Sequence, residues 1–233
     1  MMRHFSLVLT AAALTASPAP AVAQSRPAPL YSLPADGTWV EYEWEGVGTK
    51  HEPQAGTLRL SSVGRKEVQG VPHRWVEIKL SYHQGTTTTT RFRKLLVAEL
   101  AFQEGQPFSD AVTAGFARHG AAGRVTRLTR LQMNDFLGMG IGGPEAALRE
   151  VGAQEEVETG LGKFLTRYVS ARGKADGQTL EYHGWLTKQV PFGWARLEIR
   201  KRSGEAPARL IFRAVAKKQG RHAQSELAES STR

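Results

Sequence analysis

The chain has no cysteine, and its 233 residues include a single asparagine, Asn134. Without thiols, the sequence excludes a disulfide scaffold, a thiol nucleophile and an iron–sulfur centre. The stability of the fold therefore has to come from the burial of a core. Scarce asparagine beside abundant alanine, arginine and glycine is typical of proteins from GC-rich bacterial genomes.

Long apolar runs are scarce too, and the one present lies at the N-terminus. A basic start at residues 1–4, an apolar stretch at residues 5–16 and Ala21-Val22-Ala23 before Gln24 form the pattern of a signal peptide over residues 1–23. We expect export to the bacterial periplasm or the extracellular medium. No later segment reaches the ~18 apolar residues of a membrane helix, so we expect no transmembrane span in the mature chain. A lipid anchor is not expected either, because the cleavage site is not followed by cysteine.

Several catalytic signatures are missing from the sequence. There is no Gly-x-Ser-x-Gly elbow, no His-Glu-x-x-His zinc motif and no phosphate-binding loop. The glycines of residues 138–143 resemble a dinucleotide loop in spacing, but no hydrophobic strand precedes them, and we interpret them as tight turns. We predict no cofactor, no metal and no catalytic residue.

The net charge is +9, or +8 once Arg3 leaves with the signal peptide. Such an excess favours anionic partners, although an arginine-rich, solvated surface is the simpler explanation and the one we favour. Export makes nucleic acid an unexpected partner, so lipid headgroups or another anionic envelope component are the better candidates. Basic residues concentrate near the end of the chain, where we predict that three arginines steer an anion: Arg196, Arg200 and Arg213.

Alternating apolar residues predict strands in the first half of the mature chain. In residues 38–45, Val40, Tyr42 and Trp44 point one way, while Trp39 and the glutamates point the other. Similar patterns follow at residues 56–63, 74–82 and 86–97. Short turns join these segments, which predicts an antiparallel meander.

The middle of the chain has a different pattern. Ser109 can cap a helix that ends at Gly120, and Pro144 suits the first turn of another helix over residues 145–150. Strands are then expected at residues 163–172, 179–187, 194–202 and 209–215. We predict a mainly β (α+β) fold: a single curved antiparallel sheet, or half-barrel, of about eight strands with a central helical insertion at about 105–150 packed on it.

The predicted domain organisation is simple. A flexible leader covers residues 24–35, a single β-rich domain covers residues 36–216, and a disordered tail covers residues 217–233. These boundaries follow the Pro- and Ser-rich composition of the leader and the polar composition of the tail.

Aromatic residues that fall opposite the core are the candidate ligand-binding residues. Either helices cover them or they line a cleft, and for the second case we predict a cavity wall. Its candidates are Trp39, Trp75, Phe116, Phe136 and Trp185. Glu181 and His183, two residues apart on one strand face, are the one place where a hydrolytic site would be sought.

Two segments resemble the bacterial periplasmic lipoprotein-carrier superfamily (LolA-like). One is LRLSSVGRKEVQG at residues 58–70, followed by WVEI at residues 75–78. The other is EYHGWL at residues 181–186, running into VPFGWARLE at residues 190–198. The chain is also similar to uncharacterised exported bacterial proteins. The carrier resemblance implies an open curved sheet covered by helices, with an apolar cavity between them, and it transfers no functional residue.

The sequence thus leaves three classes of function open. The leading hypothesis is an exported, non-catalytic binding protein for an apolar or amphipathic ligand, namely a lipid or lipoprotein acyl chain. The alternative is an envelope-associated module that binds a protein partner and has no cavity. A hydrolase of unknown type is the third.

Overall fold

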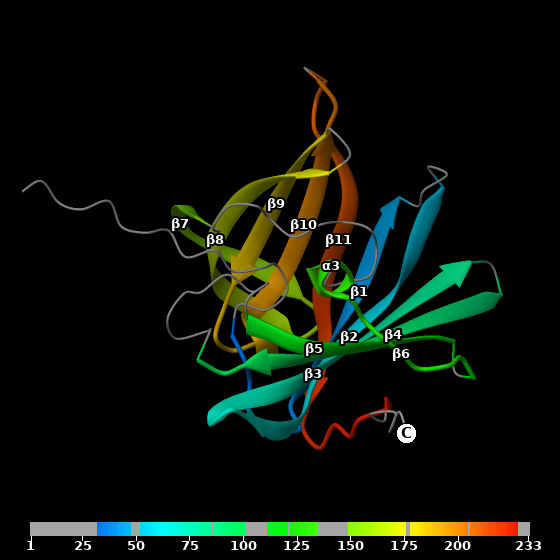
Figure 1. Cartoon of the computed structure of the whole chain (residues 1–233). Coiled ribbons are helices and arrows are strands. Elements are labelled where there is room, and N and C mark those ends of the chain that lie inside the picture. The colour runs from blue at the N-terminus through cyan, green and yellow to red at the C-terminus, as the bar shows by residue number, and fades with distance from the viewer. Residues whose placement is uncertain are drawn as a thin grey trace, which may run out of the picture.

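The computed structural model describes residues 32–47, 52–84, 86–100, 111–120, 122–134, 149–175, 178–204 and 206–227 (Figure 1). These residues form one eleven-stranded antiparallel sheet, with one short α-helix and one 3₁₀ turn. The strands are β1 (Trp39–Val47), β2 (Pro53–Val68), β3 (Val71–Gln84), β4 (Thr87–Ala98), β5 (Val112–His119), β6 (Thr126–Arg127), β7 (Arg149–Thr159), β8 (Gly162–Ala175), β9 (Gln178–Leu186), β10 (Trp194–Arg202) and β11 (Arg209–Gly220). The helix α3 spans Arg130–Asn134, and the turn η1 spans Pro191–Gly193.

The sheet consists of two meanders, which are joined by the pairing of the first strand of the chain with the last one. Its strand order is β6-β5-β4-β3-β2-β1-β11-β10-β9-β8-β7. Strands that are consecutive in the sequence pair with each other from β1 through β6 and again from β7 through β11, and β6 and β7 are the two edges of the sheet. The pairing of β1 with β11 then joins the two groups, which Figure 1 shows as the blue-to-green and olive-to-red parts of the sheet.

The eight strands predicted from alternation are all present, as β1–β4 and β8–β11. The predicted helical insertion is wrong, because the described part of residues 105–150 contains β5, β6 and the start of β7, and its one helix is the five-residue α3. The segment expected to form the first helix is β5, which pairs with β4 from Arg91↔His119 to Val97↔Val112. Its apolar residues fit a helical spacing, but pairing with the edge of β4 overrides that local pattern.

The second expected helix ends in a strand as well. Arg149 and Glu150 open β7 and pair with β8, and residues 144–148 lie outside the described residues. Together with β5 and β6, β7 raises the strand number from the expected eight to eleven. Within the described ranges, no helix is both long enough and apolar enough to cross a membrane.

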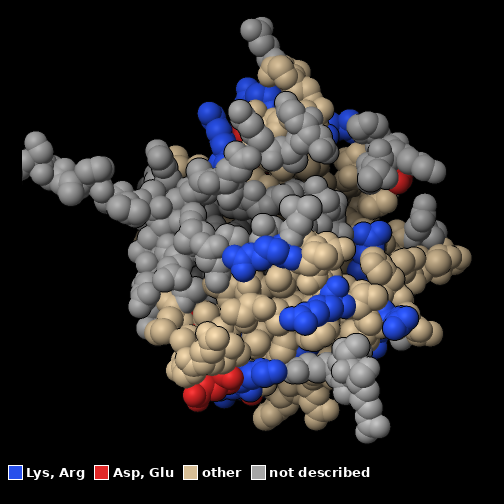
Figure 2. All heavy atoms as spheres, viewed as in Figure 1, with Lys and Arg blue, Asp and Glu red and all other residues tan. Residues whose placement is uncertain are grey.

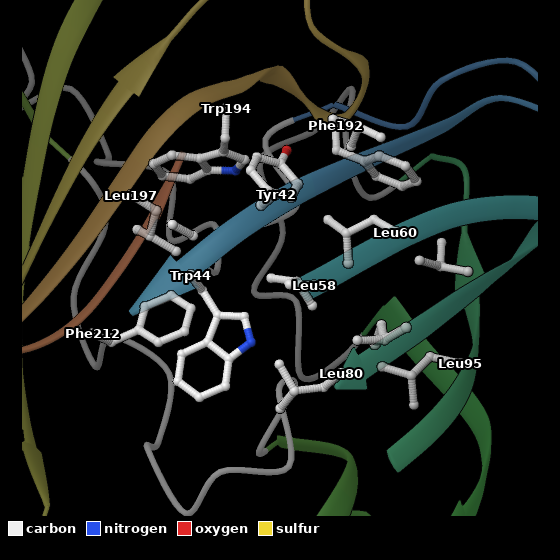
Figure 3. Close-up of a cluster of buried hydrophobic side chains, with 14 of the residues drawn as sticks. Tyr42, Trp44, Leu58, Leu60, Leu80, Leu95, Phe192, Trp194, Leu197 and Phe212 are labelled. Carbon is white, nitrogen blue, oxygen red and sulfur yellow. The ribbon is translucent and has the colours of Figure 1, made fainter. Parts of the chain in front are cut away.

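One face of the sheet carries the main hydrophobic core, and we call it the core face (Figure 3). As predicted, Val40, Tyr42 and Trp44 of β1 all point into it. Trp44 stacks on Phe212 at 5.7 Å between ring centroids and meets Tyr82 edge-on at 5.2 Å. Burying an apolar side chain of this kind contributes roughly 1.5–3 kcal/mol, so this face carries most of the stability of the fold.

Two polar atoms in this core have no hydrogen-bond partner. They are the Tyr42 hydroxyl and the Trp194 indole Nε1, on side chains that are 2% and 1% exposed. Figure 3 shows the two side chains next to each other among aliphatic and aromatic neighbours. Burial alone raises the pKa of Tyr42 above its ordinary value, so its hydroxyl remains protonated.

Replacing Tyr42 with phenylalanine therefore removes a buried polar atom and preserves the ring. We expect Tyr42→Phe to leave the free energy of unfolding unchanged or to raise it by about 1 kcal/mol, because an unpaired buried hydroxyl costs about 1–3 kcal/mol. Urea denaturation measures the change. A loss of more than about 1 kcal/mol would show that the hydroxyl has a partner. Tyr42→Ala, which removes the ring, should instead lower the free energy of unfolding by several kcal/mol.

The face opposite the core holds the C-terminal segment against β3 and β4. The buried carboxylate of Glu77 accepts hydrogen bonds from the Ser225 hydroxyl (2.8 Å) and from the backbone N–H groups of Glu226 (3.0 Å) and Leu227 (3.1 Å). The buried Lys94 ammonium donates to the Ser225 hydroxyl and to the Leu227 carbonyl. Leu227 is 0% exposed.

The structure at both chain ends differs from the predicted leader and tail. Residues 217–220 continue β11, and residues 225–227 are fixed by Glu77 and Lys94, although a disordered tail was expected from residue 217. At the other end, Ser32 donates its backbone N–H to the Phe192 carbonyl, and the Pro34 carbonyl accepts from Arg74.

The C-terminal contacts should therefore contribute to stability. We expect Leu227→Ala to lower the free energy of unfolding by about 2–4 kcal/mol, because it empties a fully buried site. Gln224→Ala, an exposed position in the same segment, is the matched control and should change it by less than about 0.5 kcal/mol. Equal effects of the two substitutions in chemical denaturation would contradict this assignment.

Candidate functional site

The strands β7–β11 curl until β7 reaches β10 and β11, from which β8 and β9 separate it in the sheet order. At the tip of the β7–β8 hairpin, the Gly160 N–H donates to the Ala216 carbonyl of β11 at 2.9 Å. Val157 and Thr166 of this hairpin are buried, whereas Glu156 and Leu165, on its other face, are exposed. The curl therefore encloses the face opposite the core, and we call this enclosed surface the roll interior (Figure 1).

Glu198 of β10 is the centre of the roll interior. Its side chain is 0% exposed, and three guanidinium groups surround its carboxylate. Arg196 contacts Oε1, Arg213 donates to the same oxygen through Nε at 3.0 Å, and Arg200 donates to Oε2 at 3.0 Å. Burial opposes ionisation, but the hydrogen bonds from Arg196 and Arg200 outweigh it and hold the pKa of Glu198 below its ordinary value.

Aromatic rings lie beside this carboxylate on the neighbouring strands. Register pairs place Trp185 opposite both Tyr168 and Arg196. The Tyr168 and Trp185 rings are 5.2 Å apart, and the Arg196 guanidinium lies 4.5 Å from the Trp185 ring in a cation–π contact. The Trp185 indole N–H donates to Glu155 of β7 at 2.8 Å, which ties β9 to the outer strand of the β7–β8 hairpin across β8. Tyr168 and Trp185 are both partly exposed, so solvent reaches these rings.

His183 lies opposite Glu198 and completes the cluster. Its Nδ1 forms a short hydrogen bond with the Tyr168 hydroxyl. Burial, followed by the charge of Arg200, lowers the pKa of His183, while burial and the charge of Glu155 raise the pKa of Tyr168. A neutral imidazole beside a protonated phenol means that Tyr168 donates to Nδ1 and that Nε2 carries the ring proton.

Two donors in the roll interior lack a partner. They are Nε2 of His183 and Nε of Arg196, both buried. Nε2 lies 3.8 Å from Oε2 of Glu181, which is longer than a hydrogen bond. Buried donors are normally paired, so these two nitrogens are exceptions, as are the Tyr42 hydroxyl and the Trp194 Nε1 in the core.

The roll interior holds several ion pairs. Four arginines (Arg196, Arg200, Arg202 and Arg213) bind three carboxylates (Glu45, Glu181 and Glu198). Arg202 binds Glu181 at 2.8 Å, and Arg213 also binds Glu45 at 3.0 Å. The three arginines predicted to steer an anion are thus together in the structure, and each is bound to a carboxylate of the protein itself.

The predicted cavity-wall residues lie in three places. Trp185 is in the roll interior. Trp75 and Phe116 pack against each other at 5.9 Å on the same face of β3 and β5, with the Lys94 ammonium 5.1 Å from the Trp75 ring. Trp39 of β1 lies under the Arg59 guanidinium at 4.1 Å, and Phe136 lies outside the described residues. The structure therefore does not assemble these five residues into one wall.

Sequence reasoning missed Glu198 and Tyr168 as site residues. Glu198 was interpreted as an interruption in a basic, water-facing strand, whereas it binds the bases on either side of it. The pattern Arg196-x-Glu198-x-Arg200 could have indicated this, since residues two apart share one face of a strand. Arg213 and Tyr168 reach the site from other strands, and the pattern of one strand does not predict the register with which other strands pair.

The two residues proposed for a hydrolytic site, Glu181 and His183, do lie close together, with 3.8 Å between Oε2 and Nε2. The register also places Ser170 of β8 opposite His183. No group of three or more metal-ligating side chains occurs in the described ranges.

Comparison with known proteins places the chain near two solved structures. One is the "putative exported protein with YmcC-like fold" from Bacteroides fragilis NCTC 9343, at 9% identity and a TM-score of 0.36, covering 81% of this chain and 98% of that one. The other is a "putative lipoprotein" from Parabacteroides distasonis ATCC 8503, at 9% identity and a TM-score of 0.37, covering 82% and 98%. No family model and no curated protein matches the chain. The resemblance to the lipoprotein carriers is not confirmed.

The Glu198 cluster should make stability depend on pH. A carboxylate whose pKa is lowered by folding stabilises the protein above its unfolded pKa, and this contribution is lost as the pH falls through the folded pKa. We expect Glu198→Gln to lower the thermal midpoint at pH 7 and to flatten its decline on acidification below about pH 5. Glu156→Gln, on the exposed face of the roll, is the control and should keep the wild-type profile. Parallel profiles for wild type and Glu198→Gln would contradict the assignment.

Proposed function

We propose that this chain is an exported, non-catalytic binding protein for an amphipathic ligand, such as a lipid, whose polar part sits in the roll interior. The observation that carries the proposal is the combination of two buried donors without partners and two partly exposed aromatic rings in the same enclosed surface. Binding sites for small molecules typically combine apolar and aromatic walls with a few convergent polar groups.

The walls of the roll interior supply both kinds of contact. Trp185 and Tyr168 offer ring surface, and Val157 of the hairpin faces the same side. Apolar ligand surface removed from water against such walls contributes ~25 cal/mol per Å². The polar atoms of His183 and Arg196 would hold the oxygen-containing part of the same molecule.

Export supports a role in the bacterial envelope. The N-terminal signal-peptide pattern is the basis of this part of the proposal, and the net charge of +9 favours approach to anionic envelope surfaces. On the face shown in Figure 2, Lys and Arg are spread over the described surface with little acidic surface visible. Long-range steering would come from this dispersed charge, because the arginines of the roll interior are already paired.

The test compares two tryptophans on the same face of the sheet. Mature protein purified from a bacterial envelope is expected to carry a lipid that native mass spectrometry and organic extraction identify. We expect Trp185→Ala to reduce the retained lipid, and the binding of an apolar fluorescent dye, at least fivefold. Trp39 lies outside the roll interior, so Trp39→Ala is the matched control. This variant should bind lipid and dye as the wild type does.

Two results would overturn the proposal. One is a clean apo mass together with no gain in dye fluorescence, which would favour the packed envelope module that binds a protein partner. The other is an equal loss of binding in Trp185→Ala and Trp39→Ala while both variants keep the wild-type melting temperature. That result would place any binding outside the roll interior.

A further inference from the structure

A row of basic side chains crosses the face opposite the core, outside the roll interior. Residues directly opposite each other in an antiparallel sheet share a face, and the register pairs Arg59 of β2 with Lys79 of β3. Phe92 of β4 follows Lys79 in this row, and Arg118 of β5 follows Phe92. On β6, Arg127 pairs with the residue two positions before Arg118, so it extends the row to the edge of the sheet. We call these five residues the basic row.

The arginines of the basic row are accessible and carry no counter-charge from the described residues. Arg127 is exposed, and Arg59 and Arg118 are partly exposed, so solvent reaches all three. None of them forms an ion pair within the described ranges. Lys79 differs, because the Glu226 carboxylate binds its ammonium at 2.8 Å. The row thus contrasts with the roll interior, where each arginine binds a carboxylate of the protein.

The basic row holds its cations together against their mutual repulsion. Arg59 and Lys79 lie directly opposite each other, and like charges in such positions destabilise a sheet. The Phe92 ring has the Lys79 ammonium at 5.3 Å and the Arg118 guanidinium at 4.3 Å from its centroid. These cation–π contacts hold the side chains in place but do not neutralise their charge. An anion bound along the row would relieve the repulsion.

The dimensions and surroundings of the row favour an extended anionic surface over a single small anion. Neighbouring strands are about 4.8 Å apart, so the row from β2 to β6 spans about 19 Å. The next row toward the β3–β4 hairpin carries only hydroxyl groups on β2 to β4, from Thr57, Ser81 and Thr90. At the β1 side, the partly exposed Trp39 ring lies 4.1 Å from the Arg59 guanidinium. Tryptophan beside a cation is typical of protein surfaces that meet a membrane interface.

We propose that the basic row docks the protein on a membrane surface that contains anionic phospholipid. Headgroup phosphates present negative charge over a plane, and arginine binds phosphate through charge-assisted hydrogen bonds. The exposed Arg221 adds a further cation beside the row, since its carbonyl accepts the Trp39 indole N–H at 3.3 Å. The signal-peptide pattern favours an envelope membrane over nucleic acid as the anionic partner. This inference goes beyond the proposed function, because it requires no ligand in the roll interior.

Vesicle sedimentation of the mature protein tests the inference. We expect binding to vesicles of phosphatidylcholine and phosphatidylglycerol, and none to phosphatidylcholine alone. Raising the salt from about 50 to about 500 mM should weaken binding at least tenfold, because salt screens exposed charges. The row variant combines Arg59→Gln, Arg118→Gln and Arg127→Gln and should also bind at least tenfold more weakly than wild type.

The matched control removes the same amount of charge from elsewhere on the surface. It combines Lys188→Gln, Lys201→Gln and Arg209→Gln, at exposed or partly exposed positions outside the row. Its affinity should stay within about twofold of wild type, because the basic row is intact. Equal losses in the two triple variants would mean that net charge alone attracts the protein, and would overturn the inference. Absence of binding to the anionic vesicles at low salt would overturn it too, as would a preference for an acidic polysaccharide over them.

Single substitutions keep the inference testable if the row variant folds poorly. Arg127→Glu reverses a charge at an exposed position and should weaken vesicle binding at least fivefold, whereas Arg209→Glu, also exposed, should not. Similar binding by these two variants would contradict the inference. Arg127→Glu should bind the apolar dye as wild type does, because β6 lies outside the roll interior. Loss of vesicle binding with intact dye binding therefore separates this inference from the proposed function.

Discussion

The pairing of β1 with β11 is the constraint on which the rest of the structure depends. It joins two meanders that would otherwise each end in a free edge. Its register places the large rings of Tyr42 and Trp44 opposite the small side chains of Ala216 and Ala214, so the rings fit into the core face without steric clashes. On the other face, the same register brings Arg213 to Glu45 and thus carries β11 into the charge cluster of the roll.

Because side chains alternate along each strand, this register separates two chemistries. Leu197 and Ile199 of β10 enter the core, while Arg196, Glu198 and Arg200 enter the roll interior. A slip of one residue would place Arg196, Glu198 and Arg200 in the core, at a cost that no local contact offsets. The curled β7–β8 hairpin then covers the polar face. One side of β10 is therefore buried by hydrophobic packing in the core, and the other is buried by this hairpin.

Alternation was sufficient to predict eight strands, the core residues of β1 and the grouping of β1–β4 into a meander. It failed at residues 111–120, where the spacing of Val112, Gly115 and Phe116 fits a helix and only the free edge of β4 decides the outcome. It also placed Trp75 and Trp185 correctly opposite the core, but it could not say that the curl encloses one and not the other. Curvature depends on contacts between distant strands, such as Gly160 with Ala216, and no single segment encodes them.

The Glu198 cluster is hard to explain by stability alone. A buried carboxylate with three arginines loses much of its Coulombic gain to desolvation, and well-packed apolar residues often stabilise such a position equally well or better. The core face of the same strands shows that the chain can fill a surface with leucine, isoleucine and aromatic rings. Polar side chains are nevertheless retained in this enclosed surface, with His183 Nε2 and Arg196 Nε left without a hydrogen-bond partner, which is the arrangement that the proposed binding function requires.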